Sequence, residues 1–321
     1  MPHAPARDTP AHLTIDGSVA SPGHVPDEKE RTYAAHAEWL SQSRYIDYPL
    51  HIGLESRALC NASCDFCPYP SMRRKGERMP DELLAKVLDD IDDMPKDLPL
   101  EVNLARMNEP FADKRVPGLA LELEHRFPQV SLWFFTNASP LVGSVLDKLC
   151  DLRRVTQFVL SFNDHRKEVY EHVMGLRYDQ TVANIDALHA MVEASQVCFT
   201  PLVTRVGDAT DADREFLDWT RDRWPRFQHR VTNRYNWLGS VETPTVGPVP
   251  YTGCWQWFHM PILSSGKVAW CTLDHEGDRS WGHVADQHLL DIYNEPSRRA
   301  LRMNLPMRRG VTVCTNCNHF G

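Results

Sequence analysis

The segment LHIGLESRALCNASCDFC, residues 50–67, decides the fold, because an apolar stretch runs directly into three closely spaced cysteines. Cys60, Cys64 and Cys67 form a C-x3-C-x2-C arrangement, with Phe66 just before the third cysteine. Three thiolates on one loop can hold three irons of a [4Fe–4S] cluster and leave the fourth iron open, as a catalytic metal site keeps an open position. Structural zinc sites more often use two separated cysteine pairs. The loop therefore predicts an iron–sulfur site with one exchangeable position.

Strand-like and helix-like patterns alternate from Leu50 onward. Candidate strands lie at 50–56, 100–105, 130–136, 155–162, 197–204 and 228–234. Between them, Pro80 stands at a helix start, and Val182, Ile185 and Leu188 repeat at helical spacing. Strands joined by helices pair in parallel as right-handed βα units. Six units rather than eight predict an α/β fold, a partial (β/α)6 barrel whose site lies at the C-terminal ends of the strands.

Composition limits the possible partners and compartment. The chain has 321 residues, 42% hydrophobic residues and a formal net charge of −8, and no basic run exceeds the three residues 73–75. This charge argues against a nucleic acid or an anionic membrane surface as the main partner. No apolar stretch reaches the roughly 18 to 20 residues that span a bilayer, and no signal core is present. We therefore expect a cytoplasmic protein, in which nine cysteines are metal ligands or buried thiols rather than disulfides.

We expect three parts in the chain. Residues 1–47 form an irregular arm and a short helix, residues 48–245 the barrel, and residues 246–321 a small tail that begins in the Pro- and Gly-rich linker at 242–253. The tail has its own cysteines, Cys254, Cys271, Cys314 and Cys317, and Gly266 is placed to turn a β-hairpin between the first two. Four thiolates from two separated segments can close a metal site completely. A structural zinc ion is the alternative occupant, since zinc accepts the same ligands.

The cysteine loop after the first strand resembles that of the radical S-adenosylmethionine (SAM) superfamily. The resemblance implies a [4Fe–4S] cluster whose open iron binds the amino and carboxylate groups of SAM, and a 5′-deoxyadenosyl radical that abstracts hydrogen from the substrate. Asn108-Glu109-Pro110 resembles the glycine–glutamate motif of that family, whose glutamate accepts hydrogen bonds from the SAM ammonium. Here Met107 and Asn108 stand where small residues are usual.

Further strand ends resemble the family's contacts with SAM or substrate. Besides Phe66 and Glu109, the resemblance points to residues after strands three, four and five: Asn137 in FFTNAS, Ser161 and Asn163 in SFND, and Arg205 in VTRV. Arg205 could pair with the SAM carboxylate or an anionic substrate, or form an ordinary ion pair. Helix capping is an equally good interpretation of the other polar residues.

The tail resembles the SPASM/twitch family of auxiliary-cluster domains over SSGKVAWCTLDHEGDRSWGHVADQHLLDIYNEPSRRALR, residues 264–302. Only the four residues NHFG follow Cys317, so we expect the shorter twitch form with one [4Fe–4S] cluster. The resemblances together imply two [4Fe–4S] clusters, one SAM-binding and one auxiliary, with SAM as cosubstrate. They also imply an external electron donor such as flavodoxin or ferredoxin.

Several reactions fit this architecture. The resemblance to twitch-containing dehydrogenases of aminocyclitol and aminoglycoside biosynthesis, the 2-deoxy-scyllo-inosamine dehydrogenases among them, favours oxidation of an alcohol carbon with the auxiliary cluster as electron acceptor. An epimerase would need a thiol hydrogen donor, for which Cys198 in the fifth candidate strand is the leading choice. Modification of a ribosomal peptide remains open, although residues 1–47 look too short for a leader-binding domain. The non-enzymatic alternative is a zinc-stabilised binding protein.

A base that takes the substrate proton cannot be identified from the sequence alone. The candidates by position are Lys75, Arg205, Asp274, His275 and Glu276.

Overall fold

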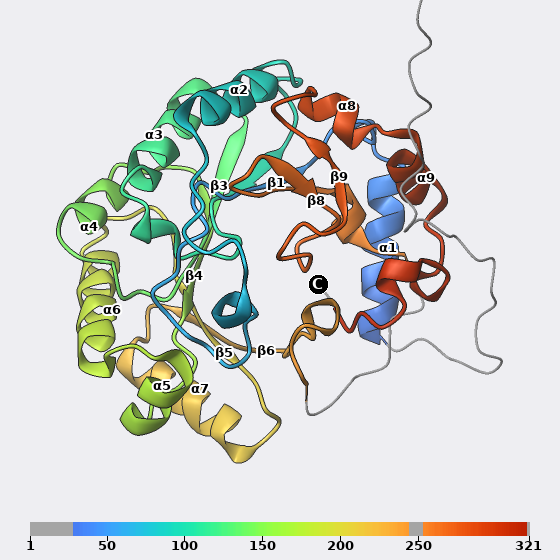
Figure 1. The fold of residues 1–321 in the computed structure, drawn as a ribbon. Coiled ribbons are helices and arrows are strands. Elements are labelled where there is room, and N and C mark those ends of the chain that lie inside the picture. Colours follow the sequence, from blue (N-terminus) through green and yellow to red (C-terminus); the bar gives the residue numbers. More distant parts are fainter. Residues whose placement is uncertain (1–27, 244–252, 320–321) are drawn as a thin grey trace, which may run out of the picture.

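The structure, a computed structural model, describes residues 28–243 and 253–319, and in these one curved sheet lies inside an arc of helices (Figure 1). The irregular arm predicted before residue 27 and most of the linker predicted at 242–253 lie outside the described residues. The predicted short N-terminal helix is present as α1 (Glu28–Ser41). No helix in the described part of the chain is long and apolar enough to cross a membrane.

The barrel strands pair in parallel, as the alternating pattern predicts. Their bounds are β1 (His51–Leu54), β2 (Leu100–Asn103), β3 (Val130–Thr136), β4 (Val155–Ser161), β5 (Leu202–Val206) and β6 (Gln228–Thr232). The helices between them are α2 (Asp81–Asp92), α3 (Val116–Arg126), α4 (Ser144–Leu149), α5 (Lys167–Met174), α6 (Tyr178–Glu193) and α7 (Asp211–Arg223). The α/β class and the partial barrel are confirmed.

One predicted strand is misplaced. The fifth strand begins at Leu202 rather than at residue 197, so Cys198 lies in the loop between α6 and β5. Val197 and Phe199 are buried on either side of the exposed Cys198, which imitates a strand's alternation. The burial comes from loop packing instead, since the Phe199 ring stacks on Phe158 at 4.7 Å.

The tail extends the barrel sheet. Its strands are β7 (His259–Ile262), β8 (Lys267–Ala269) and β9 (Ser280–His283). In the described residues the sheet has nine strands in the order β6-β5-β4-β3-β2-β1-β7-β8-β9, with β7 parallel to β1 and the last two pairings antiparallel. Gly266 turns the β7–β8 hairpin with φ +93°, a conformation that favours glycine, so the predicted hairpin is confirmed.

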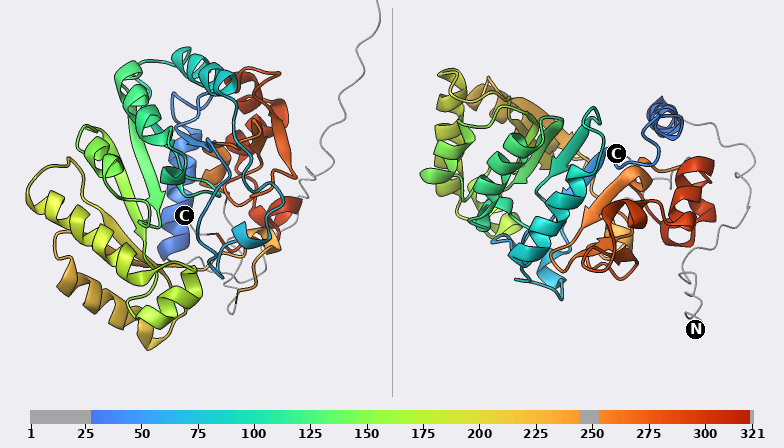
Figure 2. Two further views of the ribbon diagram at one scale, coloured as in Figure 1. Left: turned by 60° about the vertical axis from the view of Figure 1, so that its left-hand side comes forward. Right: turned by 90° about the horizontal axis from the view of Figure 1, so that it is seen from above.

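Short helices complete the tail beside α1. They are α8 (Leu289–Tyr293) and α9 (Pro296–Asn304), and the 3-10 helices η4 (Trp255–Phe258), η5 (Arg308–Gly310) and η6 (Thr312–Cys314). Figure 2 shows α1 and the tail on the same side of the barrel, and α1 contacts η4. The predicted tail therefore packs on both the N-terminal helix and the edge of the barrel at β1.

The strand register separates an inner face of the sheet from the face that packs against helices. Val130, Leu132 and Phe134 of β3 are fully buried in the core shared with the helices. The intervening Trp133 and Phe135 pair with Gln157 and Val159 of β4, and Phe135 is 40% exposed. Continuing this register places Ser161, Thr204 and Arg230 on the same inner face. The concave side of the barrel thus carries both accessible side chains, such as Phe135 and Ser161, and buried ones, such as Thr204.

Candidate active site

The loop that follows β1 packs tightly on the end of α5. It carries the three barrel cysteines, Cys60, Cys64 and Cys67. The Ser63 N–H donates to the Met174 carbonyl at 2.9 Å. Gly175 ends α5 with φ +66°, and a Cβ there would lie 2.2 Å from Ser63 Oγ. A glycine at this position is therefore what allows the cysteine loop to approach the helix so closely.

The barrel cysteines are partly exposed neighbours whose thiols resist ionisation. Burial raises the pKa of Cys60 to about 12 and that of Cys67 to about 11, and it also raises the pKa of Cys64. The charges of Cys67 and Cys60 contribute to the rise at Cys64. Thiols bind a metal in their deprotonated form, so cluster binding here would release their protons.

Glu109 lies beneath this loop as the N-cap of the 3-10 helix η2 (Pro110–Ala112). Its carboxylate accepts hydrogen bonds from Phe111 N (3.2 Å), Thr136 Oγ1 (2.8 Å) and Asn137 N (2.7 Å). Burial raises its pKa to about 7 in spite of these donors. The Glu109 N–H donates to the Leu59 carbonyl at 2.8 Å, directly before Cys60. The side chain thus joins the strand ends of β2 and β3 and retains at most one free acceptor position.

Asn137 connects β3 to the cysteine loop. Its Nδ2 donates to Asn61 Oδ1 at 2.9 Å and lies 3.9 Å from Cys60 Sγ. Its backbone N–H is the donor to Glu109. Of the residues suggested by resemblance, Asn137 and Glu109 are therefore brought together with the barrel cysteines.

Ser161 and Asn163 meet at the end of β4. Asn163 Nδ2 donates to Ser161 Oγ at 2.9 Å, and its Oδ1 accepts from Val206 N at 2.9 Å. Asn163 has φ +68°, a left-handed conformation that asparagine tolerates. Asn163 is thus a buried clamp between β4 and β5, whereas Ser161 stands on the inner face where a ligand could reach its hydroxyl.

The position of Arg205 in the structure contradicts the predicted contact between this residue and SAM. Thr204 pairs with inner-face Ser161, so Arg205, the next residue, points to the helix side of the sheet. Its guanidinium forms ion pairs with Asp164 (2.7 Å), Asp208 (2.8 Å) and Asp213 (2.8 Å). A buried arginine with three carboxylate partners has no free edge for another anion, so its role is structural.

The prediction that Cys198 is a catalytic residue is also wrong. It lies before the N-terminal end of β5, whereas the barrel cysteines follow the C-terminal end of β1 in the same parallel sheet. Its Sγ is exposed and lies 3.9 Å from Arg153 Nη1. A hydrogen-atom donor must touch the substrate carbon, which this placement at the opposite end of the strands precludes.

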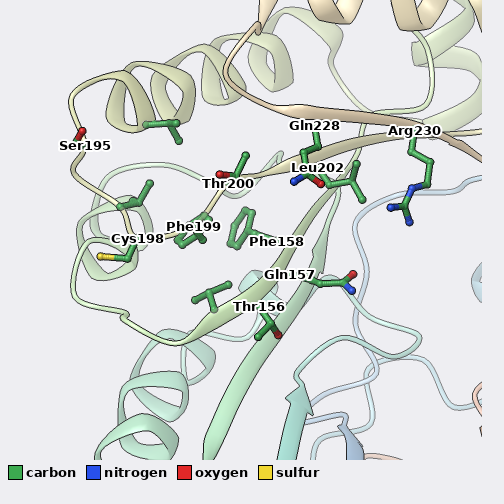
Figure 3. Close-up of a pocket in the computed structure, with 13 residues that line it drawn as sticks. Thr156, Gln157, Phe158, Ser195, Cys198, Phe199, Thr200, Leu202, Gln228 and Arg230 are labelled. Carbon is green, nitrogen blue, oxygen red and sulfur yellow. The ribbon is translucent and has the colours of Figure 1, made fainter. Parts of the chain in front are cut away.

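Around Cys198 lies a pocket of about 580 Å³ at the N-terminal ends of β4, β5 and β6 (Figure 3). Gln157 and Arg230 lie on the opposite side of this pocket from the Cys198 thiol. The pocket includes neither the barrel nor the tail cysteines. It is therefore separate from the candidate active site.

The tail cysteines form a second, closed group. Cys254, Cys271, Cys314 and Cys317 are between 5% and 6% exposed. Burial raises the pKa of Cys271 well above its usual value, and the charges of the other three raise it further. Burial also raises the pKa of Cys314 to about 12. These thiols, far apart in the sequence, are thus gathered at one buried place.

One segment links the two cysteine groups. Residues 234–237, after β6, contact the barrel loop at Asp65 and Phe66 and the tail at Asn316 and Asn318. The bonds are Arg234 Nη2 to Asp65 O (2.9 Å), Trp237 Nε1 to Phe66 O (3.0 Å), Asn236 Nδ2 to Asn316 O (2.6 Å) and Asn236 N to Asn318 Oδ1 (2.9 Å). The carbonyl of Phe66, rather than its ring, makes the specific contact.

Arg106 occupies the space between the two groups. Its Nη2 donates to the Thr272 carbonyl (3.2 Å), next to Cys271, and the following residue, Met107, packs near Cys60 and Cys67. A Cβ on Gly53 would lie 2.7 Å from Arg106 Cδ, so the glycine in β1 makes room for the arginine. Within the described residues Arg106 Nε is buried without a hydrogen-bond partner. Sequence patterns did not single out this arginine.

The remaining candidates for a general base are engaged in loop contacts. Asp274 accepts a hydrogen bond from a backbone N–H at 3.2 Å, and Glu276 accepts one at 2.7 Å. Lys75 donates to a backbone carbonyl, and the His275 carbonyl accepts from an arginine of the neighbouring loop at 2.7 Å. The contacts of His275 and Glu276 join the tail to the loop 73–75.

Thiol-only donor sets fit iron–sulfur clusters. Among the described residues, no three His, Cys, Asp or Glu side chains lie where they could share one metal ion. A four-iron cluster spreads its thiolate ligands over a larger body than a single zinc ion does. Three cysteines suit a cluster with an open iron and four suit a closed one.

Comparison with known proteins agrees with this division. Residues 254–318 match the SPASM family, described as an iron–sulfur cluster-binding domain. That range contains all four tail cysteines. No curated protein matches the chain at a significant level.

Solved structures share the fold at low sequence identity. BtrN in complex with AdoMet and 2-DOIA is 16% identical, with a TM-score of 0.53 over 84% of this chain and 93% of that chain. Streptococcus suis SuiB bound to precursor peptide SuiA is 15% identical, with a TM-score of 0.63 over 85% and 70%. Native anSMEcpe with bound AdoMet and Cp18Cys peptide is 12% identical, with a TM-score of 0.57 over 79% and 82%.

The chain thus shares the fold of these solved structures, and its residues 254–318 match an iron–sulfur cluster-binding domain. The described part of that range contains four cysteines.

Proposed function

We propose that the protein is a radical SAM dehydrogenase that oxidises an alcohol carbon of a small polar substrate, such as a carbohydrate or aminocyclitol. The observation that carries this proposal is the second cysteine group, buried and closed by four thiols, in a tail whose strands β7, β8 and β9 continue the barrel sheet from β1. A closed site beside the first can take up an electron but cannot bind SAM. An enzyme that only returns a hydrogen atom to its substrate has no use for such an acceptor.

When bound, the two clusters supply an electron for cleavage of SAM and an acceptor for the electron that the substrate loses. The balance is then closed. The alcohol gives one hydrogen atom, which ends in 5′-deoxyadenosine, and one proton to a base. It also gives one electron to the auxiliary site, and an external donor such as flavodoxin or ferredoxin supplies the electron that splits SAM into methionine and 5′-deoxyadenosine.

The residues of the barrel rim would orient SAM. Cys60, Cys64 and Cys67 would hold the first cluster, and Asn137 fixes this loop through Asn61. Glu109 offers one remaining acceptor position to the SAM ammonium, and Ser161 offers a hydroxyl on the inner face. These roles match the geometry of the strand ends, with Arg205 excluded.

A polar substrate is favoured by the arginine between the two groups. Arg106 has a free Nε and stands on the inner side of β1, held by Thr272 and Gly53. Burial lowers its pKa to about 10, so it remains a cation at neutral pH and can donate to a hydroxyl or an oxyanion. We expect it to contact the substrate and hold the alkoxide as the proton leaves.

Peptide modification is the second candidate. It is favoured by the likeness in fold to SuiB and anSMEcpe, whose structures contain peptides. The inner face is also open, with Phe135 40% exposed. A peptide side chain carrying a hydroxyl or thiol could lie there as a sugar would.

The test is deuterium transfer in the anaerobically reconstituted protein. Iron, sulfide and zinc are measured first, and about eight irons per chain are expected for two clusters. Polyols and aminocyclitols deuterated at the carbinol carbon are then incubated with SAM and reduced flavodoxin. Deuterium in 5′-deoxyadenosine, together with an equal amount of ketone, supports the dehydrogenase.

The other outcomes point elsewhere. Deuterated 5′-deoxyadenosine with an epimer instead of a ketone contradicts net oxidation. Label transfer only from peptides supports the second candidate. Zinc in place of iron after reconstitution overturns radical chemistry and leaves the zinc-stabilised binding protein.

A further inference from the structure

A buried arginine stands beside the tail cysteines. Arg308 opens η5 and is 1% exposed. Its Nε donates to the carbonyl of Gly253 at 3.4 Å, and its Nη1 donates to the carbonyl of His319. Gly253 directly precedes Cys254, and His319 follows Cys317 by two positions. The guanidinium therefore joins the two segments that bring cysteines to the site.

This arginine lacks a carboxylate partner within the described residues. Its Nη2 is buried without a hydrogen bond there, and no Asp or Glu of the described chain lies within ion-pair distance. Burial lowers the pKa of Arg308, but the charges of Cys254, Tyr33, Cys317 and Cys314 outweigh it and raise the pKa. A buried cation is costly unless an anion approaches it, and the thiolates of the tail cysteines can supply that charge.

Tyr33 of α1 completes this environment. Its hydroxyl lies 3.2 Å from Cys254 Sγ, and its ring lies under the Arg308 guanidinium, 4.6 Å from ring centroid to Cζ. A tyrosine hydroxyl, with an ordinary pKa of about 10, keeps its proton at neutral pH. Toward a metal-bound thiolate, which can only accept, the hydroxyl must donate.

We propose that Arg308 and Tyr33 raise the reduction potential of the auxiliary iron–sulfur site and thereby make it an electron acceptor. This inference rests on the proposed function, since it concerns the cluster held by the tail cysteines. Both are positioning residues that act through the thiolates and do not touch the substrate.

The direction of the effect follows from electrostatics. Each electron added to a cluster adds negative charge, and a buried site without compensating charge resists it. The Arg308 cation stabilises the reduced state more than the oxidised state, and the Tyr33 hydrogen bond to sulfur acts in the same direction. Removing either must lower the midpoint potential.

The experiment is a redox titration of the reconstituted protein followed by electron paramagnetic resonance. The variants are Arg308→Gln, Arg308→Lys and Tyr33→Phe. The matched control is Arg302→Gln, because Arg302 is also a fully buried arginine of the tail but binds the Tyr293 carbonyl (2.7 Å) and the Asn294 side chain (2.9 Å). Iron content and melting temperature are measured for every variant.

For Arg308→Gln we expect the ratio of reduced to oxidised auxiliary cluster, at a fixed ambient potential, to fall about tenfold, or about 59 mV for one electron. Tyr33→Phe should lower the midpoint potential less than Arg308→Gln does. Arg308→Lys should keep most of the wild-type midpoint potential because the positive charge is kept. The control should not shift.

Two failures are distinguishable. If the auxiliary cluster assembles and the Arg308→Gln and Tyr33→Phe potentials equal that of wild type, the inference is wrong and the proposed function stands. If only about four irons bind and no second signal exists in wild type, the proposed acceptor site itself is absent and both fail. Should Arg308→Gln not fold, Tyr33→Phe alone decides, because it removes one hydroxyl and keeps the ring.

Discussion

The two cysteine groups differ in the same way as an open and a closed metal site. The barrel cysteines lie on a partly exposed loop between a strand and a helix, and Asn137 and Glu109 lie near Cys60. The tail cysteines are almost completely buried beside the Arg308 guanidinium. One group can therefore exchange a ligand and the other can store charge. Substitutions in the two groups should separate these roles.

The largest effect on chemistry is expected from the barrel group. The triple variant Cys60→Ala, Cys64→Ala, Cys67→Ala should lose SAM cleavage to the background of the reductant while keeping about four irons. Because these thiols are only partly buried, the melting temperature of the apoprotein should stay within about 3 °C of wild type. Retained SAM cleavage in this variant would contradict the assignment of the open site.

The tail group should show the converse behaviour. Cys314→Ala with Cys317→Ala should also retain about four irons, yet SAM cleavage should persist while ketone formation falls steeply. The tail also loses its metal staple, so the reconstituted variant should unfold at a lower temperature than the triple barrel variant. Equal loss of SAM cleavage in both variants would mean that the groups do not act separately.

A smaller effect is expected at Glu109. In Glu109→Gln an amide NH2 replaces one oxygen and faces a donor from Phe111, Thr136 or Asn137. The variant also lacks the carboxylate charge that would accept from the SAM ammonium, and a hydrogen bond to a charged group contributes about 1.5–3 kcal/mol, so SAM affinity should fall roughly 10- to 150-fold. Binding is measured on the reconstituted protein by equilibrium dialysis. The control is Glu122→Gln on the exposed side of α3, which should bind SAM as wild type does.

Short-range patterns are enough to predict an open site because its chemistry is local. The spacing of Cys60, Cys64 and Cys67 and their position after an apolar strand could be read directly. Arg205 was misjudged because alternation fixes which residues share a face but not which face is the inner one. Only the folded sheet, in which Thr204 pairs with Ser161, shows that Arg205 points away from the inner face.

Long-range contacts explain what the sequence could not reveal. Arg308 lies in a short turn that carries no motif, and its partners Gly253, Tyr33 and His319 come from three separate segments. Arg106 needs the room left by Gly53, which lies in another strand. Such residues acquire their environment from tertiary packing and carry no local signature.

The smallest effect is expected at Cys198, a thiol that belongs to neither cysteine group. It is exposed before β5, at the opposite end of the strands from the barrel cysteines, so Cys198→Ala removes no buried contact and no donor near SAM. Rates of 5′-deoxyadenosine and product formation should both stay within about twofold of wild type, and the free energy of unfolding within about 0.5 kcal/mol.

The measurement for Cys198→Ala is a single-turnover assay that follows both products. Cys150→Ala, a partly buried thiol at the C-terminal end of α4, serves as the control for loss of any one sulfur. Loss of product with undiminished 5′-deoxyadenosine would instead identify Cys198 as the hydrogen donor of an epimerase and would require the loop before β5 to reach the rim of the barrel.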